Sequence, residues 1–277
     1  MSINFDEIID RRGTSCLKYD FAVERGYPKD VLPFWVADMD FRAPVPVIDA
    51  LTARTAHGIF GYTQVKDDYF NVLRDWFRTR HAWTVQRDEL VITPGVVFAI
   101  ATAIRAYTAP NEAVIIQQPV YYPFASMIRQ NGRTLIDSPL RFADGHYSID
   151  FADFEQKIID HKVKLFVLCS PHNPVGRVWT RAELEQLAAI CLRHHVIVVA
   201  DEIHEEFVRP GFRHTPFASL SADAAAITVT CTSPSKTFNL AGLQISNIFI
   251  SDESLRRRFK EELSRTGYDE PNTLGLA

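Results

Sequence analysis

The sequence predicts an α/β fold with a mostly parallel sheet and helices on both faces. Strand-like apolar runs alternate with helical patterns between residues 90 and 265, and this order places a helix between successive parallel strands. The two clearest runs, 163–169 and 196–200, are rich in β-branched residues, which is typical of strands that are buried on both faces. Between these runs, Thr180 and Glu183 have the spacing of a capping box that opens a helix.

The remaining elements follow from the same patterns. Residues 1–45 contain many prolines and glycines, so we expect an irregular N-terminal arm. The body, residues 46–277, should form one large domain, and its two N-terminal helices should be joined by an exposed connector at Gly61-Tyr62-Thr63. We expect helices at 46–58, 66–82, 96–107, 151–160 and 255–265, and further strands at 90–92, 112–118, 133–140, 226–231 and 245–250.

Composition excludes several classes of protein. The chain has 277 residues, 47% of them hydrophobic, and a net charge of -4, so it can build a large core and has no basic stripe for nucleic acid. The apolar run 96–104 is stopped by Arg105, far short of a bilayer span, and residues 1–12 are too acidic for a secretory signal. These observations favour the cytoplasm, a small-molecule partner, and no membrane contact.

The cysteines do not suggest a disulfide or a metal site. None has CxxC spacing, and Cys169, Cys191 and Cys231 lie in apolar periodic segments. We therefore expect these three to be small buried hydrophobic residues.

Chemically unusual residues gather where the predicted strands end. Ligands of open α/β sheets bind outside the carboxyl ends of the strands, which makes five loop regions the candidates for a site. These regions are 93–97, 119–122, 170–176, 201–204 and 232–236. Their agreement is a stronger indication than any single motif.

Lys236 lies in a loop of small hydroxylated residues just after the strand 226–231. An imine-forming amine would suit this position, because the hydroxyls of Ser233 and Ser235 would hold an anionic group beside it. Taken alone, the pattern fits a solvated loop lysine better, and it is the company of the upstream motifs that favours the functional interpretation.

Asp201 ends an apolar strand, where a buried carboxylate requires a cation as its partner. A protonated pyridine nitrogen would serve, and a helix N-cap is the ordinary alternative. A metal site formed by Asp201, His204, Glu205 and Glu206 ranks behind both, because no second cluster of ligands supports it. We therefore expect no metal.

Three further positions complete the candidate site. Asn173, between two prolines, would donate to a phenolate oxygen, although a plain Asn-Pro turn explains it equally. The amides of Val96 and Val97 open a helix and would bind phosphate, unless this is an ordinary helix start. Tyr121 would stack on a flat ring, or serve as a core or rim tyrosine.

Together these motifs resemble the pyridoxal-phosphate enzymes of the fold type I aminotransferase superfamily. The resemblance rests on Asn173-Pro174-Val175-Gly176, Asp201-Glu202-Ile203-His204 and Ser233-Pro234-Ser235-Lys236. Further stretches are similar to the cystathionine β-lyase (carbon–sulfur lyase) branch: Trp35-Val36-Ala37-Asp38-Met39-Asp40, Gly61-Tyr62, Val120-Tyr121-Tyr122-Pro123-Phe124 and Phe238-Asn239-Leu240-Ala241-Gly242. The match spans essentially the whole chain.

The resemblance implies a role for each site residue. Lys236 would link the cofactor and then carry protons at the substrate α-carbon, while Asp201 would keep the pyridine nitrogen protonated. The other cofactor contacts would come from Val96, Val97, Tyr121, Asn173, His204 and Ser233. Tyr62 would act as a catalytic residue that reaches the phosphate of a neighbouring subunit, so a homodimer is implied.

The resemblance also implies the reaction. In this superfamily, aminotransferases usually carry a tyrosine where His204 stands and an arginine where Gln244 stands, so the chain favours the lyase branch. The implied reaction is β-elimination at a sulfur amino acid such as cystathionine, giving a thiol, pyruvate and ammonia. A PLP-dependent aminotransferase is the alternative, and a non-catalytic regulatory or binding protein that keeps the fold is another.

The resemblance has a consequence for the domains as well. The family continues beyond the position of Ala277 into a small C-terminal domain that includes the arginine for the substrate carboxylate. We therefore expect residues 1–45 to be an arm and part of an incomplete small domain, and 46–277 to be the large cofactor-binding domain. The C-terminal small domain is expected to be absent, with reduced activity as the result.

Overall fold

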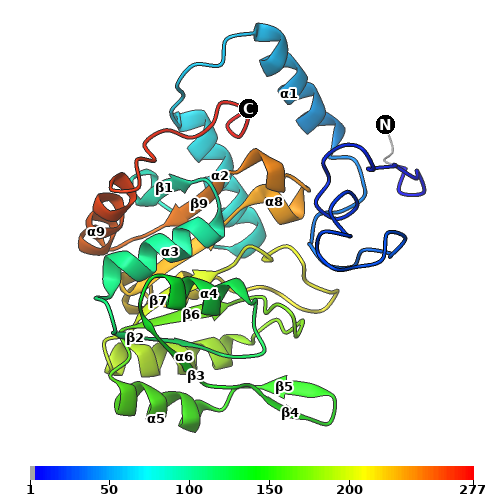
Figure 1. Cartoon of the computed structure of the whole chain (residues 1–277). Coiled ribbons are helices and arrows are strands. Elements are labelled where there is room, and N and C mark those ends of the chain that lie inside the picture. Colours follow the sequence, from blue (N-terminus) through cyan, green and yellow to red (C-terminus); the bar gives the residue numbers. More distant parts are fainter. Residues whose placement is uncertain (1–3) are drawn as a thin grey trace.

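A seven-stranded sheet forms the centre of the protein, as described for residues 4–277 by a computed structural model (Figure 1). The strands lie in the order β1-β9-β8-β7-β6-β2-β3. Neighbouring strands from β8 to β3 are parallel, whereas β9 (Ser246–Phe249) is antiparallel to both β8 and β1. The predicted mostly parallel α/β sheet is confirmed.

The elements lie close to their predicted positions. The other strands of the sheet are β1 (Leu90–Thr93), β2 (Ala113–Ile116), β3 (Thr134–Asp137), β6 (Leu165–Cys169), β7 (Ile197–Asp201) and β8 (Thr228–Thr232). The helices are α1 (Val45–His57), α2 (Asp67–His81), α3 (Val96–Tyr107), α4 (Pro123–Gln130), α5 (Phe151–His161), α6 (Arg181–Arg193), α7 (Ala222–Ala226), α8 (Pro234–Thr237) and α9 (Glu253–Ser264).

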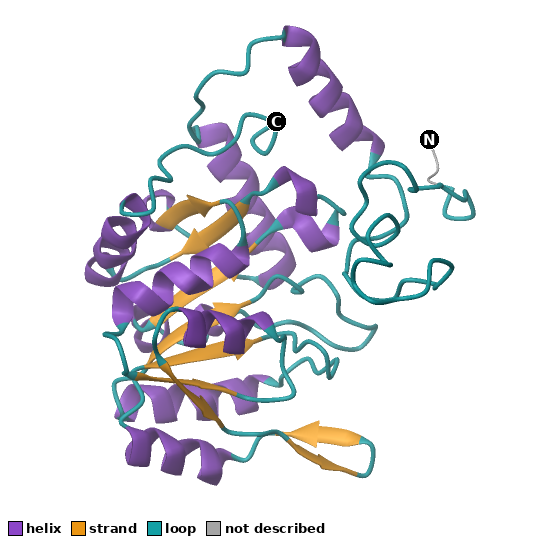
Figure 2. Ribbon diagram, in the orientation of Figure 1, coloured by secondary structure: helices purple, strands orange, loops and turns teal. Residues whose placement is uncertain are grey.

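Helices cover both faces of the sheet, because each central strand is apolar on both sides (Figure 2). On β6, Val167 and Cys169 join the core cluster that contains α3, α4 and α9. The alternate residues, Phe166 and Leu168, join the cluster that contains α5 and α6. This alternation follows from the two-residue repeat of a strand, and it explains why the sequence shows a continuous apolar run there.

The capping box that the sequence predicts is present. Thr180 accepts a hydrogen bond from the amide of Glu183, and the Glu183 side chain accepts one from the amide of Thr180. Arg177 also pairs with Glu183, at 2.7 Å. The start of α6 is therefore fixed beside the 170–176 loop, one of the predicted site loops.

Two features differ from the sequence expectations. An exposed hairpin, β4 (Arg141–Ala143) with β5 (His146–Ser148), follows β3. Its turn residues Asp144 and Gly145 both have positive φ, as in the tight turns that favour Asp-Gly. The short helices α4, α7 and α8 were not predicted either, because eight residues or fewer show too little of a helical repeat.

The N-terminal arm contains no helix or strand between residues 4 and 44. Helix α1 follows it and, although every one of its residues is described, it buries none of them. Both segments lie beside the sheet domain rather than within its layers (Figure 1). Across residues 4–277, no helix has the length and apolar character needed to cross a membrane.

Candidate active site

A cavity of about 820 Å³ opens at the carboxyl ends of the parallel strands. All five predicted loop regions contribute to it, because parallel strands end at the same edge of a sheet. Eight of the nine residues predicted from the sequence line it: Val96, Val97, Tyr121, Asn173, Asp201, His204, Ser233 and Lys236. The structure thus brings together groups that are up to 140 positions apart in the sequence.

Asp201 is the last residue of β7 and is 4% exposed. One of its oxygens accepts a hydrogen bond from the amide of Ile203, at 3.2 Å. The pKa of Asp201 is raised to about 7, chiefly by burial and also by the neighbouring Glu202, against the opposing effects of the Ile203 amide and Lys236. This carboxyl group is therefore strongly suited to a cationic partner in the cavity.

Lys236 lies on α8, which directly follows β8, the strand beside β7. Ser233 caps this short helix: its hydroxyl oxygen accepts a hydrogen bond from the amide of Ser235 and donates one to the carbonyl of Ile245, at 2.7 Å. The Ser233 hydroxyl is thus already engaged with the backbone. Ser235, which also lines the cavity, is an additional hydroxyl for an anionic ligand.

Helix α3 points its N-terminus into the same cavity. Gly95, at the N-cap position, has no side chain with which to cap the helix, and Gly95, Val96 and Val97 all line the cavity. Amides in the first turn of a helix have no partner within the helix, and they attract anions. This end of the cavity is suited to a phosphate group.

Three polar or aromatic side chains complete the walls. Tyr121 packs edge-on against Phe124, with ring centroids 5.9 Å apart, and burial raises the pKa of its hydroxyl. The backbone amide of Asn173 donates to the sulfur of Cys169 at 3.3 Å, which anchors this residue next to β6. Burial lowers the pKa of His204 to about 4, and Lys236 contributes to the same effect, so the imidazole is neutral at neutral pH.

Tyr62 is the one predicted site residue that does not line this cavity. It lies on the connector between α1 and α2 and is 93% exposed, among residues such as Phe60 and Pro271. Its predicted role concerns a neighbouring subunit, and it stays a prediction.

A buried acidic group lies behind Asp201. Ligand atoms of Glu202, Glu205 and His214 lie within 4.8 Å of one another. His214 is 3.0 Å from Glu202, which also accepts from the amide of Phe217, so these two side chains satisfy each other. Burial raises the pKa of Glu205 well above its ordinary value, with Glu202 as the next cause. The Oε2 atom of Glu205 is buried without a hydrogen-bond partner among the described residues, so the protonated form of this side chain is favoured.

The sequence reasoning missed the contribution of the arm to the cavity. Seven arm residues line it: Leu17, Arg25, Tyr27, Phe34, Trp35, Val36 and Ala37. Tyr27 stacks on Trp35 with ring centroids 4.4 Å apart. The stretch Trp35 to Asp40 is one of the motifs that resemble the lyase branch, and it was the only sequence signal for this wall.

Fold and site together define a class of protein, and the comparisons identify it. Residues 29–268 match the family model "Aminotransferase class I and II". The chain belongs to this family.

Among its relatives is the cystathionine beta-lyase PatB of Bacillus subtilis, which is 48% identical over 96% of this chain and 68% of PatB. Cystalysin from Treponema denticola, whose crystal structure contains pyridoxal 5'-phosphate, is similar with a TM-score of 0.95 at 38% identity, covering all of this chain and 71% of cystalysin. The PLP-bound C-S lyase of Staphylococcus hominis gives a TM-score of 0.92 at 35% identity, over all of this chain and 69% of the lyase.

Proposed function

We propose that the protein is a pyridoxal-phosphate-dependent carbon–sulfur lyase that acts on cystathionine or a similar sulfur amino acid. The observation that carries the proposal is the meeting of Lys236 and Asp201 in one cavity with the N-terminus of α3. Lys236 supplies an amine, Asp201 a buried carboxyl group, and the start of α3 backbone amides without a partner in the helix. The relatives in the lyase branch support the choice of reaction.

The residues fit this cofactor. A carboxyl group whose burial raises its pKa to about 7 would gain a charge-assisted hydrogen bond from a protonated ring nitrogen. The amides of Val96 and Val97, with the hydroxyl of Ser235, would hold the phosphate, and the ring of Tyr121 would stack on the cofactor. A cavity of about 820 Å³ has room for the cofactor and a small amino acid.

Bound pyridoxal phosphate supplies a sink for the electron pair that the α-carbon keeps when it loses its proton. The chain supplies the rest. The Lys236 amine would carry the proton from the α-carbon, Asp201 would stabilise positive charge at the ring nitrogen, and the Asn173 side chain would donate to the ring oxygen. The C–S bond then breaks, and with one water the products of cystathionine are homocysteine, pyruvate and ammonia.

His204 and Gln244 support a lyase rather than an aminotransferase. Both line the cavity. Gln244 stands where aminotransferases of the superfamily usually carry an arginine, so the cavity lacks that fixed positive charge, and His204, whose pKa is lowered to about 4, does not replace it. A transaminase would leave its amino group on the cofactor and need a keto acid to remove it. An eliminating enzyme releases pyruvate and ammonia without any acceptor.

The test is an assay of the purified chain, loaded with pyridoxal phosphate, on cystathionine. The proposal expects pyruvate and a free thiol to form in equal amounts without a keto acid. Turnover that requires a keto acid would show an aminotransferase instead. Binding of the cofactor without turnover of any amino acid would favour a non-catalytic protein.

The proposal includes a homodimer and a cytoplasmic location. The connector between α1 and α2 exposes Ile59, Phe60 and Tyr62, and α1 has no buried face, so a second copy of the chain would cover apolar surface here. Tyr62 would then reach the cofactor phosphate of that copy. Four free, buried cysteines suit a reducing compartment. Light scattering of the loaded chain tests the dimer, and Tyr62→Phe should weaken cofactor binding only in the dimer.

A further inference from the structure

Within the wall that the arm contributes to the cavity, residues 35–37 form a short continuous strip. Trp35, Val36 and Ala37 all line the cavity, although they lie far in sequence from the site residues of the sheet domain. The position of this strip therefore determines how much of the cavity is closed to water and how large a substrate it accepts.

The strip is held in a conformation that its own sequence disfavours. Val36 has a φ of 59°, in the left-handed region, where a β-branched side chain collides with its own backbone. Such a residue persists only where the surroundings fix it. The contacts that fix this strip are thus a functional feature of the cavity wall.

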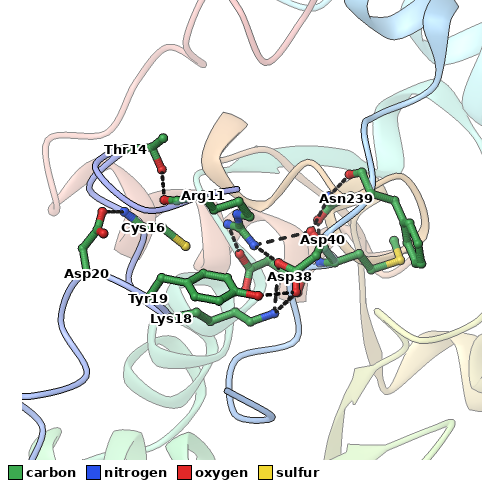
Figure 3. Close-up of polar contacts among 11 residues, drawn as sticks. Arg11, Thr14, Cys16, Lys18, Tyr19, Asp20, Asp38, Asp40 and Asn239 are labelled. Carbon is green, nitrogen blue, oxygen red and sulfur yellow. Dashed lines mark hydrogen bonds and ion pairs between the residues drawn. The ribbon is translucent and has the colours of Figure 1, made fainter. Parts of the chain in front are cut away.

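A cluster of charged and polar side chains holds the backbone directly after the strip from the side of the arm: Arg11, Lys18, Tyr19, Asp38 and Asp40 (Figure 3). Arg11 pairs with Asp38 and with Asp40, at 2.7 Å for the latter. Lys18, only 6% exposed, donates to the carbonyl of Asp38 at 3.0 Å and lies 3.3 Å from Asp40. Tyr19 donates to Asp40 at 3.0 Å.

Asn239 holds the backbone that continues the strip, at Met39 and Phe41, from the side of the sheet. Its side-chain oxygen accepts from the amide of Met39 at 2.9 Å, and its nitrogen donates to the carbonyls of Met39 and Phe41 at 3.0 and 2.9 Å. All of these bonds join segments about 200 positions apart in the sequence. No other described residue bonds to both the amide and the carbonyl of Met39 through its side chain.

Asn239 is also fixed relative to Lys236. It lies three residues after Lys236, with a φ of 60°, a value that asparagine tolerates better than most residues. The amide of Leu240 closes this turn by donating to the carbonyl of Ser235 at 2.9 Å. A single side chain therefore joins the turn that carries Lys236 to the backbone that directly follows the strip.

We propose that Asn239 is a positioning residue that fastens the 35–37 strip to the Lys236 turn. The cavity wall and the reacting lysine then keep one relative position, and the strip cannot open independently. The kinetic part of this inference rests on the proposed lyase function, whereas the structural part does not.

The test compares the cofactor-loaded wild type with Asn239→Gly, because glycine accepts the positive φ and only the side chain is lost. Hydrogen exchange of the 35–41 backbone should become at least about tenfold faster, since the Met39 amide loses its acceptor and the backbone at 39–41, which continues the strip, loses three bonds. KM for cystathionine should rise by about tenfold with kcat within about threefold, because the strip lines the cavity that would hold the substrate and offers no group for the proton transfer.

Two further variants separate positioning from general damage. Asn131→Ala removes a comparable asparagine, which donates to Met127 and accepts from Arg105 at the far end of α4; it should leave exchange at 35–41 and KM unchanged. Asp40→Asn loosens the strip from the arm side, so combining it with Asn239→Gly should raise KM by less than the product of the single effects.

Unchanged exchange at 35–41 in Asn239→Gly would overturn the inference, and so would faster exchange with unaltered KM. An equal response from Asn131→Ala would overturn it as well. If the wild type showed no lyase activity, the proposed function would fail, while the exchange comparison would still decide whether Asn239 fastens the strip.

Discussion

Replacing Asp201 with asparagine should stabilise the cofactor-free chain at neutral and alkaline pH and weaken the cofactor-bound one. The reason lies in the burial of this carboxyl group at the end of β7, which raises its pKa from 3.8 to about 7. Between these two values the unfolded chain has lost the proton while the native chain retains it. Native stability therefore falls as the pH rises through this window, and it levels off above pH 7.

The size of the effect follows from the pKa. A rise from 3.8 to about 7 corresponds to about 4 kcal/mol of destabilisation once both states are ionised. Asparagine has nearly the same shape and does not titrate, so the variant escapes this loss. The difference in unfolding free energy between variant and wild type should grow by about 2 to 3 kcal/mol from about pH 5 to about pH 8.

Urea unfolding of the two apoproteins at several pH values measures this difference. Asp30→Asn is the control, because Asp30 is exposed and its carboxylate is solvated in the native and unfolded chains alike. Adding pyridoxal phosphate should reverse the order at about pH 8, since only the aspartate gains a charge-assisted bond to the ring nitrogen. A difference that does not change with pH would refute the reasoning about burial.

Three further predictions concern Lys236, His204 and the core residue Phe154. Lys236→Ala should abolish the visible absorbance of the lysine-linked cofactor and leave the circular dichroism unchanged; a persisting band would assign the link to another lysine. Burial and Lys236 lower the pKa of His204 from 6.5 to about 4, so its NMR signals should not titrate between about pH 5.5 and pH 8. Its contribution to stability should begin to fall below pH 6.5 and be lost as the pH drops through the lowered pKa. An NMR midpoint near 6.5 would show a solvated ring. Phe154→Ala should lower the unfolding free energy by about 3 to 5 kcal/mol, because this ring is fully buried against Phe166; a loss under about 1 kcal/mol would mean that the core collapses around it.

The sequence alone determined the parts of the molecule that local patterns encode. The β-branched runs at β6 and β7 are apolar on both faces because helices cover both faces, so a continuous run sufficed to predict parallel central strands. The capping box at Thr180 and Glu183 depends on residues three positions apart, and it is present as predicted. The candidates Lys236 and Asp201 could be found because each directly follows or ends such a strand.

Only the tertiary structure decided which distant segments meet. Strand β9 runs antiparallel between β8 and β1, and no local pattern of its residues distinguishes this direction from the parallel one. The arm became a wall of the cavity through bonds such as the one between Asn239 and the Met39 amide, at a separation of 200 positions. The raised pKa of Asp201 likewise depends on burial by several elements at once. These properties arise from packing between segments, and a short sequence window does not contain the partner that each segment will have.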